Sequence, residues 1–319
     1  MIAEIGCDLV KAKAILDNGD LVAIPTETVY GLAANSLDPL AVSKIYEAKN
    51  RPSFDPLIIH VASMDDFGKY SKSFPKELIF LAQTFCPGPI TFLVEKSEII
   101  PEITTSGLSK VAIRIPKHPL TLQLLSTIDY PLAAPSANPF GYVSPTTALH
   151  VADQLGEKIP YVLDGGACQV GLESTIVGIE NNELIIYRKG GLDIDEIKRV
   201  YQGPISIKDH SSSNPQAPGM LDKHYSPNKR IEILSSWTNL NEIDSNSTGF
   251  LRFNTELEGL KNQIVLSEKS DMNEAAFKLF DALRKFDKMK IDKVFIELVP
   301  EKGLGIAIND RLRRAAAKS

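Results

Sequence analysis

The chain has 319 residues, of which 43% are hydrophobic and 24% are charged, and its formal net charge is −5. This length suits two domains with cores of their own, and the negative charge excludes a protein that holds nucleic acid through an overall positive charge. The three cysteines, Cys7, Cys86 and Cys168, lie far apart, which argues against a disulfide framework or a zinc site and suits a reducing cytosol. Charges throughout the first 20 residues, and no apolar stretch of about 20 residues, predict a soluble cytoplasmic protein that does not enter a membrane.

Helices and strands are intermixed, without strict alternation, in the first two thirds of the chain. Apolar periodicity, punctuated by Asp, Pro and Gly, predicts helices at 8–18, 38–49, 64–71, 76–84 and 144–154. Short apolar runs predict strands at 21–24, 57–61, 90–94, 111–115, 131–134, 161–163, 174–179 and 184–187. This order indicates an α/β or α+β domain with a mixed sheet, which we assign to residues 1–208.

A segment of different composition follows at 209–228. It contains serine, proline and asparagine without apolar periodicity, which predicts a linker, yet Lys223, His224 and Tyr225 stand in a row within it. Beyond it we expect strands at 231–234, 249–253, 264–266 and 294–298 and helices at 271–289 and 304–317. That alternation predicts a small Rossmann-like α/β domain over residues 229–319.

The sequence lacks several familiar catalytic signatures. Neither the phosphate loop GxxxxGK[ST] nor a GxGxxG fingerprint after a first strand occurs, and HExxH and GxSxG are absent as well. The five histidines are dispersed along the chain. We therefore assign no protein ligands for a metal.

Six polar segments follow predicted strands or end predicted helices in the first domain. They are PTETVYG (25–31), KNRP (49–52) with Asp55 and His60 beyond it, RIPKHP (114–119), APSAN (134–138) with SPT (144–146), DGG through GLEST (164–175), and Arg188. Each has a structural explanation, such as a turn with satisfied hydroxyls or a helix end capped by cations. Arg114 favours function more strongly, because an arginine inside an apolar strand is costly unless it is paired or faces a cleft.

Two of these segments suggest how the backbone could meet a ligand. A helix that begins at Ser144 would offer its free N–H groups to a phosphate or carboxylate, although Ser144 is explained almost as well by simple capping. Glycines in the 164–175 segment would let a ligand approach the main chain.

Taken together, the segments predict one binding pocket. Lys49, Arg51, Arg114 and Arg188 supply four cations near segment ends. Neutral hydrogen-bonding groups come from Thr28, Ser136, Asn138, Ser144 and Ser174. Arginine forks suit carboxylates and phosphates, and a lysine adds a compact charge. We expect these groups to converge on a hollow that holds a polyphosphate beside a small carboxylate-bearing ligand.

The same segments resemble those of the threonylcarbamoyl-adenylate synthases. The resemblance is carried by PTETVYGL, AKNRP with DPLIIH, VAIRIPKHP, AAPSAN with SPT, DGG with GLESTIV, and the linker PGMLDKHYSP, in that order over residues 8–228. The closing stretch GLGIAINDRLRRAA is similar to the end of the accessory domain in the two-domain form, which distinguishes it from the single-domain YrdC-type proteins. The resemblance implies a YrdC-like catalytic domain with a twisted sheet and a positively charged cavity.

The resemblance also implies the reaction and its participants. Members of the family combine L-threonine, bicarbonate or carbon dioxide, and ATP with Mg²⁺ to give threonylcarbamoyl-adenylate and pyrophosphate. Other proteins, the tRNA-modifying transferases, then use the product to make threonylcarbamoyl-adenosine in tRNA. A weak contact with tRNA itself is left open.

Family roles carry over residue by residue. Threonine would be held by Thr28, His60, Arg114, Ala134 and Ser174. The nucleotide would be faced by Lys49, Arg51, Asp55, Ser136, Asn138, Ser144, Arg188, His224 and Tyr225, the last two brought in by a linker that covers the cavity. Among these, Lys49 and Arg51 are the expected catalytic residues, which neutralise the triphosphate as pyrophosphate leaves, and Arg114 is expected to fix the threonine carboxylate as a fork.

Three alternatives stay open from the sequence. A basic cavity could serve an RNA-binding module, which the negative net charge disfavours. A carbamoyl transferase that uses carbamoyl-phosphate also contains a YrdC-like domain, but it normally carries acylphosphatase and zinc-finger regions that this sequence lacks. A regulator could bind ATP and threonine without turning them over.

Overall fold

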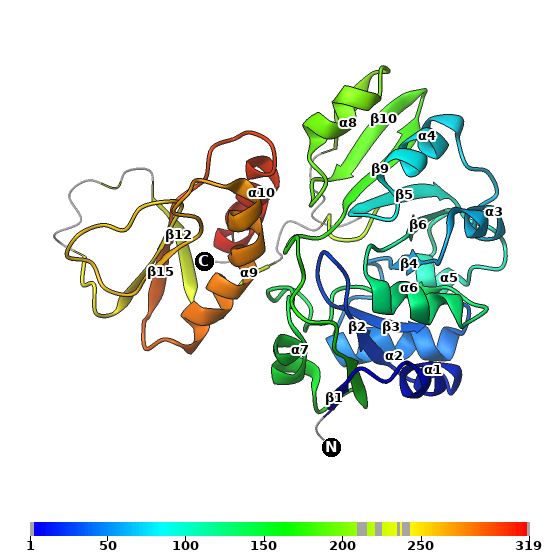
Figure 1. Ribbon diagram of the computed structural model, residues 1–319, viewed down its shortest axis with the longest axis horizontal. Helices are drawn as coiled ribbons and strands as arrows, with labels where there is room; N and C mark the ends of the chain where they lie inside the picture. The colour runs from blue at the N-terminus through cyan, green and yellow to red at the C-terminus, as the bar shows by residue number, and fades with distance from the viewer. Residues whose placement is uncertain (1–2, 209–215, 221–224, 235–236, 238–242, 318–319) are drawn as a thin grey trace.

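The protein has two lobes, each built on its own sheet (Figure 1). The computed structural model describes residues 3–208, 216–220, 225–234, 237 and 243–317. The larger lobe contains the N-terminal part of the chain and the smaller lobe the C-terminal part. The predicted linker, 209–228, falls partly outside the described residues, so its two boundaries remain predictions.

The larger lobe is organised around an eleven-stranded sheet. Its strands, in spatial order, are β1 (Glu4–Gly6), β8 (Tyr161–Leu163), β2 (Val22–Ile24), β3 (Gly31–Asn35), β7 (Leu132–Ala133), β4 (Ile58–His60), β6 (Lys110–Arg114), β5 (Ile90–Glu95), β9 (Thr175–Glu180), β10 (Glu183–Arg188) and β11 (Ile205–Ile207). The sheet contains parallel pairs such as β4–β6 and β5–β9 as well as antiparallel pairs such as β3–β7 and β5–β6. The expectation of a mixed α/β sheet is confirmed.

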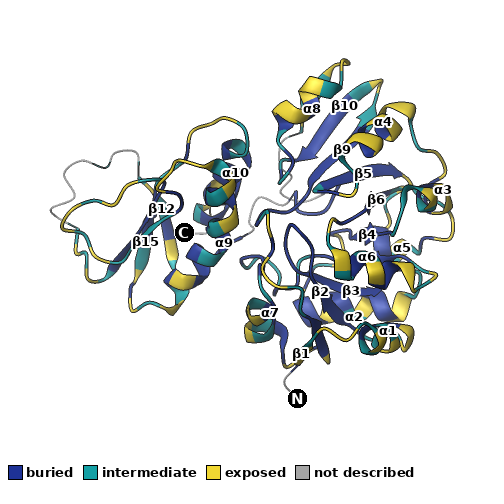
Figure 2. Cartoon of the chain, in the orientation of Figure 1, coloured by how far each residue is buried: buried dark blue, intermediate teal, exposed yellow. Residues whose placement is uncertain are grey.

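Helices cover this sheet and present their exposed faces outward (Figure 2). They are α1 (Leu9–Asp17), α2 (Pro39–Lys49), a 3₁₀ turn (Met64–Asp66) that continues into α3 (Phe67–Tyr70), α4 (Lys76–Phe85), α5 (Glu102–Thr105), α6 (Pro119–Ser126), α7 (Ala148–Leu155) and α8 (Ile194–Val200). None of the helices in the described part of the chain has the length and apolar character needed to cross a membrane.

Helix α2 begins and ends as the sequence predicts. The Asp38 side chain accepts a hydrogen bond from the Leu40 N–H, and Pro39 occupies the first turn. Asn50 ends the helix in the left-handed conformation with φ of 51°. The chain reverses there, so Lys49 and Arg51 both turn inward and are buried.

The helix predicted at 144–154 begins later than expected. Helix α7 starts at Ala148, and its N-cap is Thr147, whose side chain accepts from the His150 N–H. Residues before it are used otherwise: the Pro145 carbonyl accepts a hydrogen bond from the Tyr30 N–H at 2.9 Å, and the Ser144 hydroxyl donates to Glu173. The expectation that Ser144 opens a helix and offers its N–H groups to an anion is therefore wrong.

The smaller lobe has a four-stranded sheet in which every pair is parallel. The strand order is β12 (Arg230–Ile233), β15 (Lys293–Ile296), β13 (Thr248–Arg252) and β14 (Gln263–Val265). Helices α9 (Met272–Lys288) and α10 (Gly305–Ala316) lie on the face turned toward the larger lobe (Figure 1). This agrees with the predicted Rossmann-like arrangement.

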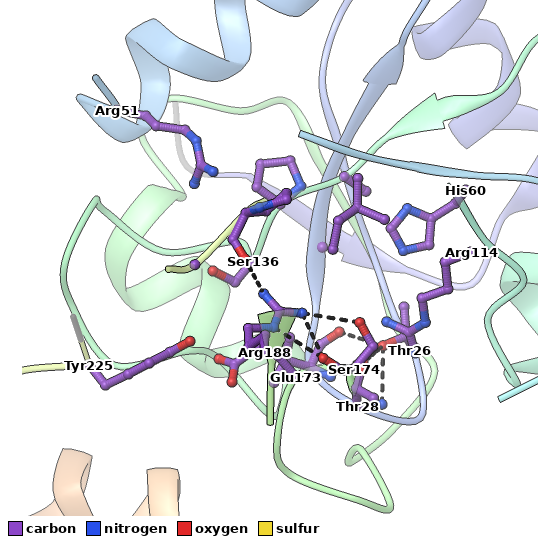
Figure 3. A pocket seen from close by; sticks show the side chains of 17 residues that line it. Thr26, Thr28, Arg51, His60, Arg114, Ser136, Glu173, Ser174, Arg188 and Tyr225 are labelled. Carbon is purple, nitrogen blue, oxygen red and sulfur yellow. Dashed lines mark hydrogen bonds between the residues drawn. The ribbon is translucent and has the colours of Figure 1, made fainter. Parts of the chain in front are cut away.

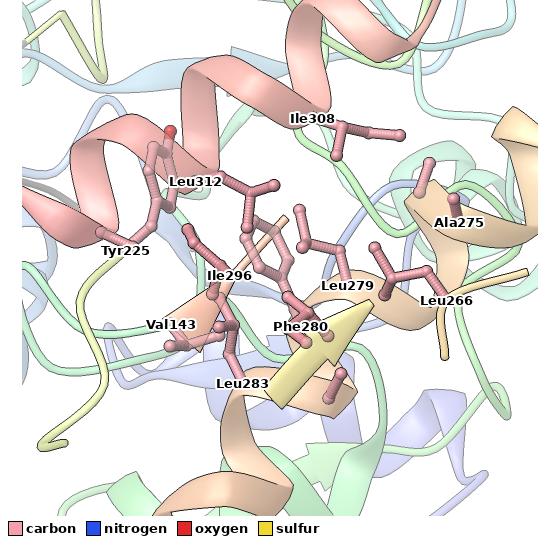
Figure 4. Close-up of a cluster of buried hydrophobic side chains, with 14 of the residues drawn as sticks. Val143, Tyr225, Leu266, Ala275, Leu279, Phe280, Leu283, Ile296, Ile308 and Leu312 are labelled. Carbon is pink, nitrogen blue, oxygen red and sulfur yellow. The ribbon is translucent and has the colours of Figure 1, made fainter. Parts of the chain in front are cut away.

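One hydrophobic cluster joins the two lobes (Figure 4). Val143 and Leu172 of the larger lobe pack with Leu279, Phe280 and other residues of α9 and α10 in the smaller. Burial of such side chains stabilises a contact by about 25 cal/mol per Å² of apolar surface. The lobes therefore share part of their core, and α9 and α10 have a fixed seat against the larger lobe.

Gly171 lies at the closest point of this contact. Its φ is +77°, and a Cβ built on it would lie 2.6 Å from the Phe277 Cα and 2.7 Å from the Ala276 carbonyl oxygen. The sequence suggested that glycines here admit a ligand. At Gly171 the approaching group is instead the backbone of α9.

We expect Gly171→Ala to lower the free energy of unfolding by about 3 kcal/mol or more. A left-handed alanine costs roughly 1–2 kcal/mol, and overpacking against a rigid backbone adds about 1–3 kcal/mol. Gly107→Ala is the matched control, because Gly107 has a φ of +78° with nothing within 4 Å of the added Cβ. Denaturant unfolding of both variants measures the difference, and equal losses of stability would contradict the tight contact.

Candidate functional site

A hollow in the larger lobe gathers most of the predicted site residues (Figure 3). The residues that line it are Thr26, Thr28, Val29, Gly31, Arg51, Ile58, His60, Arg114, Ala134, Pro135, Ser136, Glu173, Ser174, Arg188, Pro218, Gly219 and Tyr225. They come from strand ends and loops that are far apart in the sequence. Arg51, Arg114 and Arg188 face the same space from different sides.

Arg114, at the end of β6, is held by a buried ion pair. Its Nη2 donates to Glu27 Oε1 at 2.7 Å and its Nε donates to the Gly88 carbonyl at 3.3 Å. The second oxygen of Glu27 accepts from the Lys117 N–H at 2.9 Å. No described residue accepts a hydrogen bond from Nη1. A ligand carboxylate would therefore meet a guanidinium that is already oriented. Because Nη2 is paired with Glu27, only part of the expected two-pronged contact is left for the ligand.

Thr28 presents a hydrogen-bond acceptor to the hollow. The Thr26 hydroxyl donates its one hydrogen to the Val29 carbonyl at 2.6 Å, so at the 2.7 Å contact between the two threonine hydroxyls Thr28 must be the donor. The remaining lone pairs of the Thr28 oxygen suit a ligand hydroxyl or ammonium group.

His60, at the end of β4, is neutral at physiological pH. Burial, together with the nearby Arg114, lowers the pKa of His60 to about 3. Its Nδ1 is buried and has no hydrogen-bond partner among the described residues. An uncharged imidazole beside three arginines avoids adding a fourth positive charge, and it can donate or accept a hydrogen bond.

Arg51 and Lys49 lie at the end of α2 and have different hydrogen-bond partners. Arg51 lines the hollow, its Nε and Nη2 donate to the carbonyls of Asp55 and Pro56, and Nη2 lies 2.9 Å from Asp55 Oδ2. Lys49 is not among the lining residues. Its Nζ donates to the carbonyls of Ser136 and Asn138, and burial, with the nearby Arg51, lowers its pKa well below the ordinary value. Lys49 thus supports the 136–138 loop from behind.

Arg188 joins the sheet to the described part of the predicted linker. Its Nε and Nη2 donate to the Ser174 carbonyl, Nη2 also donates to the Ser174 hydroxyl at 3.1 Å, and Nη1 donates to the Pro218 carbonyl at 3.1 Å. Burial lowers the pKa of Arg188 to about 10, so it stays charged. Gly219 follows with a φ of +75°, where a Cβ would lie 2.8 Å from Nη1.

Residues 216–220 lie against the eleven-stranded sheet. Ala217 and Met220 are buried in a cluster with side chains of β4, β5, β6, β9 and β10. Pro218 and Gly219 consequently form one wall of the hollow, and Tyr225 forms another.

The structure brings together most of the residues expected at the site. Those that line the hollow are Thr28, Arg51, His60, Arg114, Ala134, Ser136, Ser174, Arg188 and Tyr225. Lys49, Asp55, Asn138 and Ser144 lie behind it, each in contact with a lining residue or its backbone. His224 lies outside the described residues.

Sequence reasoning missed the carboxylates that organise the arginines. Glu27 pairs with Arg114, and Glu173 pairs with Arg311 of α10. A buried arginine in a strand signals that a carboxylate partner exists, but nothing in the spacing identifies it. The pairs are separated by 87 and 138 positions.

The fold and the hollow define a class: a YrdC-like catalytic domain with a cationic pocket, joined to a Rossmann-like second domain. The chain belongs to the threonylcarbamoyl-AMP synthase family, a family of enzymes. Residues 14–190 match the family model described as telomere recombination, named Sua5_yciO_yrdC, and residues 192–317 match the threonylcarbamoyl-AMP synthase C-terminal domain.

Individual relatives agree with this assignment. The threonylcarbamoyl-AMP synthase of Pyrococcus abyssi is 39% identical, with 96% of this chain and 93% of the relative covered. That of Bacillus subtilis is 37% identical, with 97% and 92% covered. The structure of P. abyssi Sua5 in complex with L-threonine superposes with a TM-score of 0.90 at 36% identity, covering 99% of this chain and 98% of that one. The resemblance inferred from the motifs is thereby confirmed.

The neutral state of His60 predicts how stability depends on pH. Its pKa is about 3 when folded, against an ordinary value of 6.5. Between these values the unfolded chain binds a proton that the folded protein does not, so stability falls as pH drops below 6.5. Between pH 7.5 and pH 5 we expect the wild type to lose on the order of 2 kcal/mol more than His60→Gln. Urea unfolding at both pH values measures this, and parallel losses would contradict a buried neutral imidazole.

Proposed function

We propose that this protein makes threonylcarbamoyl-adenylate and pyrophosphate from L-threonine, bicarbonate or carbon dioxide, and ATP. The observation that carries the proposal is the convergence of Arg51, Arg114 and Arg188 on one hollow, together with Thr28, His60 and Ser174. Three guanidinium groups around small polar side chains suit an amino acid carboxylate beside a phosphate chain. The relatives' shared name and the threonine complex of P. abyssi Sua5 support the same substrates.

Threonine would occupy the side of the hollow near β4 and β6. In this proposal Arg114 binds its carboxylate through Nη1, and the Thr28 oxygen accepts from its amino or hydroxyl group. His60 then contributes an uncharged ring that orients the amine, and Ser174 and the backbone at Ala134 complete the contact. Because the imidazole is neutral, it does not repel an amine in either protonation state.

The chemical step needs alignment and charge neutralisation rather than a protein nucleophile. The amine nitrogen attacks carbon dioxide and loses a proton, which gives a carbamate. One carbamate oxygen then attacks the α-phosphorus of ATP, and the bond from that phosphorus to the bridging oxygen of pyrophosphate breaks. Arg51 neutralises the charge that builds on the leaving pyrophosphate, as positioned cations do in phosphoryl-transfer sites. Arg188, Ser136 and Tyr225 are the other proposed contacts of the nucleotide from the lining.

The residues behind the lining have supporting parts in this proposal. Lys49 holds the carbonyls of Ser136 and Asn138, and Asp55 keeps Arg51 oriented. Ser144 acts through Glu173. Direct contact with ATP is therefore proposed for the lining residues first, and His224 remains a candidate that the described residues do not include.

Magnesium, if used, would be brought by the nucleotide. The described residues contain no group of three or more His, Cys, Asp or Glu side chains suited to a metal, and the carboxylates nearest the hollow, Glu27, Asp55 and Glu173, are each paired with an arginine. Mg²⁺ is commonly held through substrate phosphates with few protein ligands. Its contribution when bound would be to offset phosphate charge.

The described part of the predicted linker has a chemical purpose in this proposal. A carbamoyl-adenylate hydrolyses readily, and Pro218, Gly219 and Tyr225 form walls of the hollow that would keep water from the intermediate. The product would pass to tRNA-modifying transferase proteins in the cytoplasm. RNA binding at several salt concentrations tests whether the protein also contacts tRNA weakly.

The reaction itself gives the first test. Purified protein supplied with ATP, L-threonine and labelled bicarbonate should release pyrophosphate in a threonine-dependent manner and incorporate the label into an adenylate. Binding of ATP and threonine without pyrophosphate release would instead identify a regulator, and RNA binding without ATP use would identify an RNA-binding module.

The two cations at the end of α2 give the second test. We expect Arg51→Ala and Lys49→Ala each to reduce kcat/KM by roughly 100-fold or more. Arg51→Ala removes a preorganised transition-state contact, whereas Lys49→Ala displaces the 136–138 loop that Lys49 holds. Lys44→Ala, on the same helix but with a side chain that is 43% exposed, should keep wild-type kinetics. Steady-state pyrophosphate release measures all three, and near-normal turnover in both Arg51→Ala and Lys49→Ala would refute the role of this helix end.

A further inference from the structure

Arg311 of α10 reaches from the second domain to the wall of the hollow. Its side chain is fully buried, and its Nε and Nη2 donate to Glu173 Oε2 at 3.1 and 3.0 Å. Its Nη1 donates to Asp310 Oδ2 at 2.7 Å. Glu173 belongs to the first domain and lines the hollow. A residue of the smaller lobe thus contacts the proposed active site through a single intermediate side chain.

Glu173 is held from both sides. Oε1 accepts from the Ser144 hydroxyl at 2.6 Å, and Oε2 accepts from Arg311. The next residue along the chain, Ser174, carries the carbonyl and hydroxyl that fasten Arg188. The backbone conformation at 173–174 therefore positions both the Glu173 carboxylate and the Ser174 oxygens that bind Arg188. Arg311 holds this turn through its ion pair with Glu173.

Arg311 also helps to hold Tyr225. The guanidinium carbons of Arg311 and Arg314 lie 4.9 and 4.7 Å from the centre of the Tyr225 ring, and Phe280 stacks on that ring with centroids 5.6 Å apart (Figure 4). Tyr225 has a φ of 67°, a conformation that a non-glycine residue keeps only when its surroundings hold it. Its surroundings here are largely α9 and α10.

The charges around Glu173 make it dependent on this contact. Arg311 faces it from α10, with Asp310 beside Arg311, and Arg188 faces it from β10. Burial alone would raise the pKa of Glu173, but Arg311, Arg188 and the Ser144 hydrogen bond outweigh burial and keep that pKa below its ordinary value. Without Arg311 the carboxylate would stay buried while losing its direct ion pair, and it would take up a proton more easily.

We propose that Arg311 is a positioning residue for the synthase reaction, through which the second domain holds Glu173 and Tyr225 in the wall of the active site. This inference rests on the proposed function and goes beyond it, because it gives the Rossmann-like domain a direct part in the geometry of catalysis. In this proposal the hollow is fully formed only when the second domain is docked against the first.

Arg311→Met tests the proposal, with Arg313→Met as the matched control on the same helix. Arg313 pairs with Glu301 and its side chain is 50% exposed. We expect Arg311→Met to lower kcat for threonine-dependent pyrophosphate release at least tenfold, and Arg313→Met to leave kcat within twofold of the wild type. Wild-type kcat in Arg311→Met would overturn the proposal.

The pH profile separates positioning from a general loss of stability. In Arg311→Met the pKa of Glu173 should rise, so log kcat/KM should acquire an acidic limb in addition to any that the wild type shows. Adding Glu173→Gln removes the titrating group, so the double variant should lose that limb. An additional acidic limb that persists in the double variant, or a profile of Arg311→Met that is parallel to the wild type, would contradict the role of Glu173.

Thermal unfolding accompanies these measurements. If Arg311→Met does not fold, Arg311→Lys, which keeps the charge but not the fork, takes its place. A folded Arg311→Lys with lowered kcat supports the proposal, and one with wild-type kcat overturns it. Failure of the wild type to release pyrophosphate would count against the proposed function, whereas an active wild type with an equally active Arg311 variant would count against the inference alone.

Discussion

Buried positive charge is the constraint on which the site depends. Arg51, Arg114 and Arg188 face one hollow, and like charges at short range in a desolvated place oppose one another and the fold. Each guanidinium is therefore held by fixed acceptors: Asp55 and carbonyls for Arg51, Glu27 for Arg114, and Ser174 with the Pro218 carbonyl for Arg188. What remains toward the hollow is a set of oriented donors in a positive field, which suits a polyanionic substrate.

This neutralisation explains features that are otherwise unrelated. His60 stays uncharged because burial next to Arg114 disfavours another cation. Lys49 is withdrawn behind the 136–138 loop, where carbonyl oxygens accept from it. The predicted linker and the second domain supply further partners, Pro218 for Arg188 and Arg311 for Glu173. The second domain is thus part of the electrostatic arrangement of the pocket as well as part of a shared hydrophobic core.

The local structure and most of the residues that line the pocket could be predicted from the sequence. The ion pairs between distant residues could not. The caps of α2, the helices α9 and α10, and the mixed sheet follow from short-range patterns. The start of α7 did not, because Thr147 caps the helix while Ser144 is drawn to Glu173 by tertiary contact. Glu27 with Arg114, and Glu173 with Arg311, could not be matched, since ion pairs over such separations depend on the folded topology. Whether Lys49 faced the hollow or supported it was likewise beyond the reach of spacing.

The most direct test is a structure of the protein with L-threonine and a non-hydrolysable ATP analogue. We predict that the threonine carboxylate meets Arg114, and that the α-phosphate lies beside it, within the part of the hollow lined by Arg51, Arg188 and Tyr225. A nucleotide bound elsewhere, or a triphosphate that contacts none of the three arginines, would contradict this prediction.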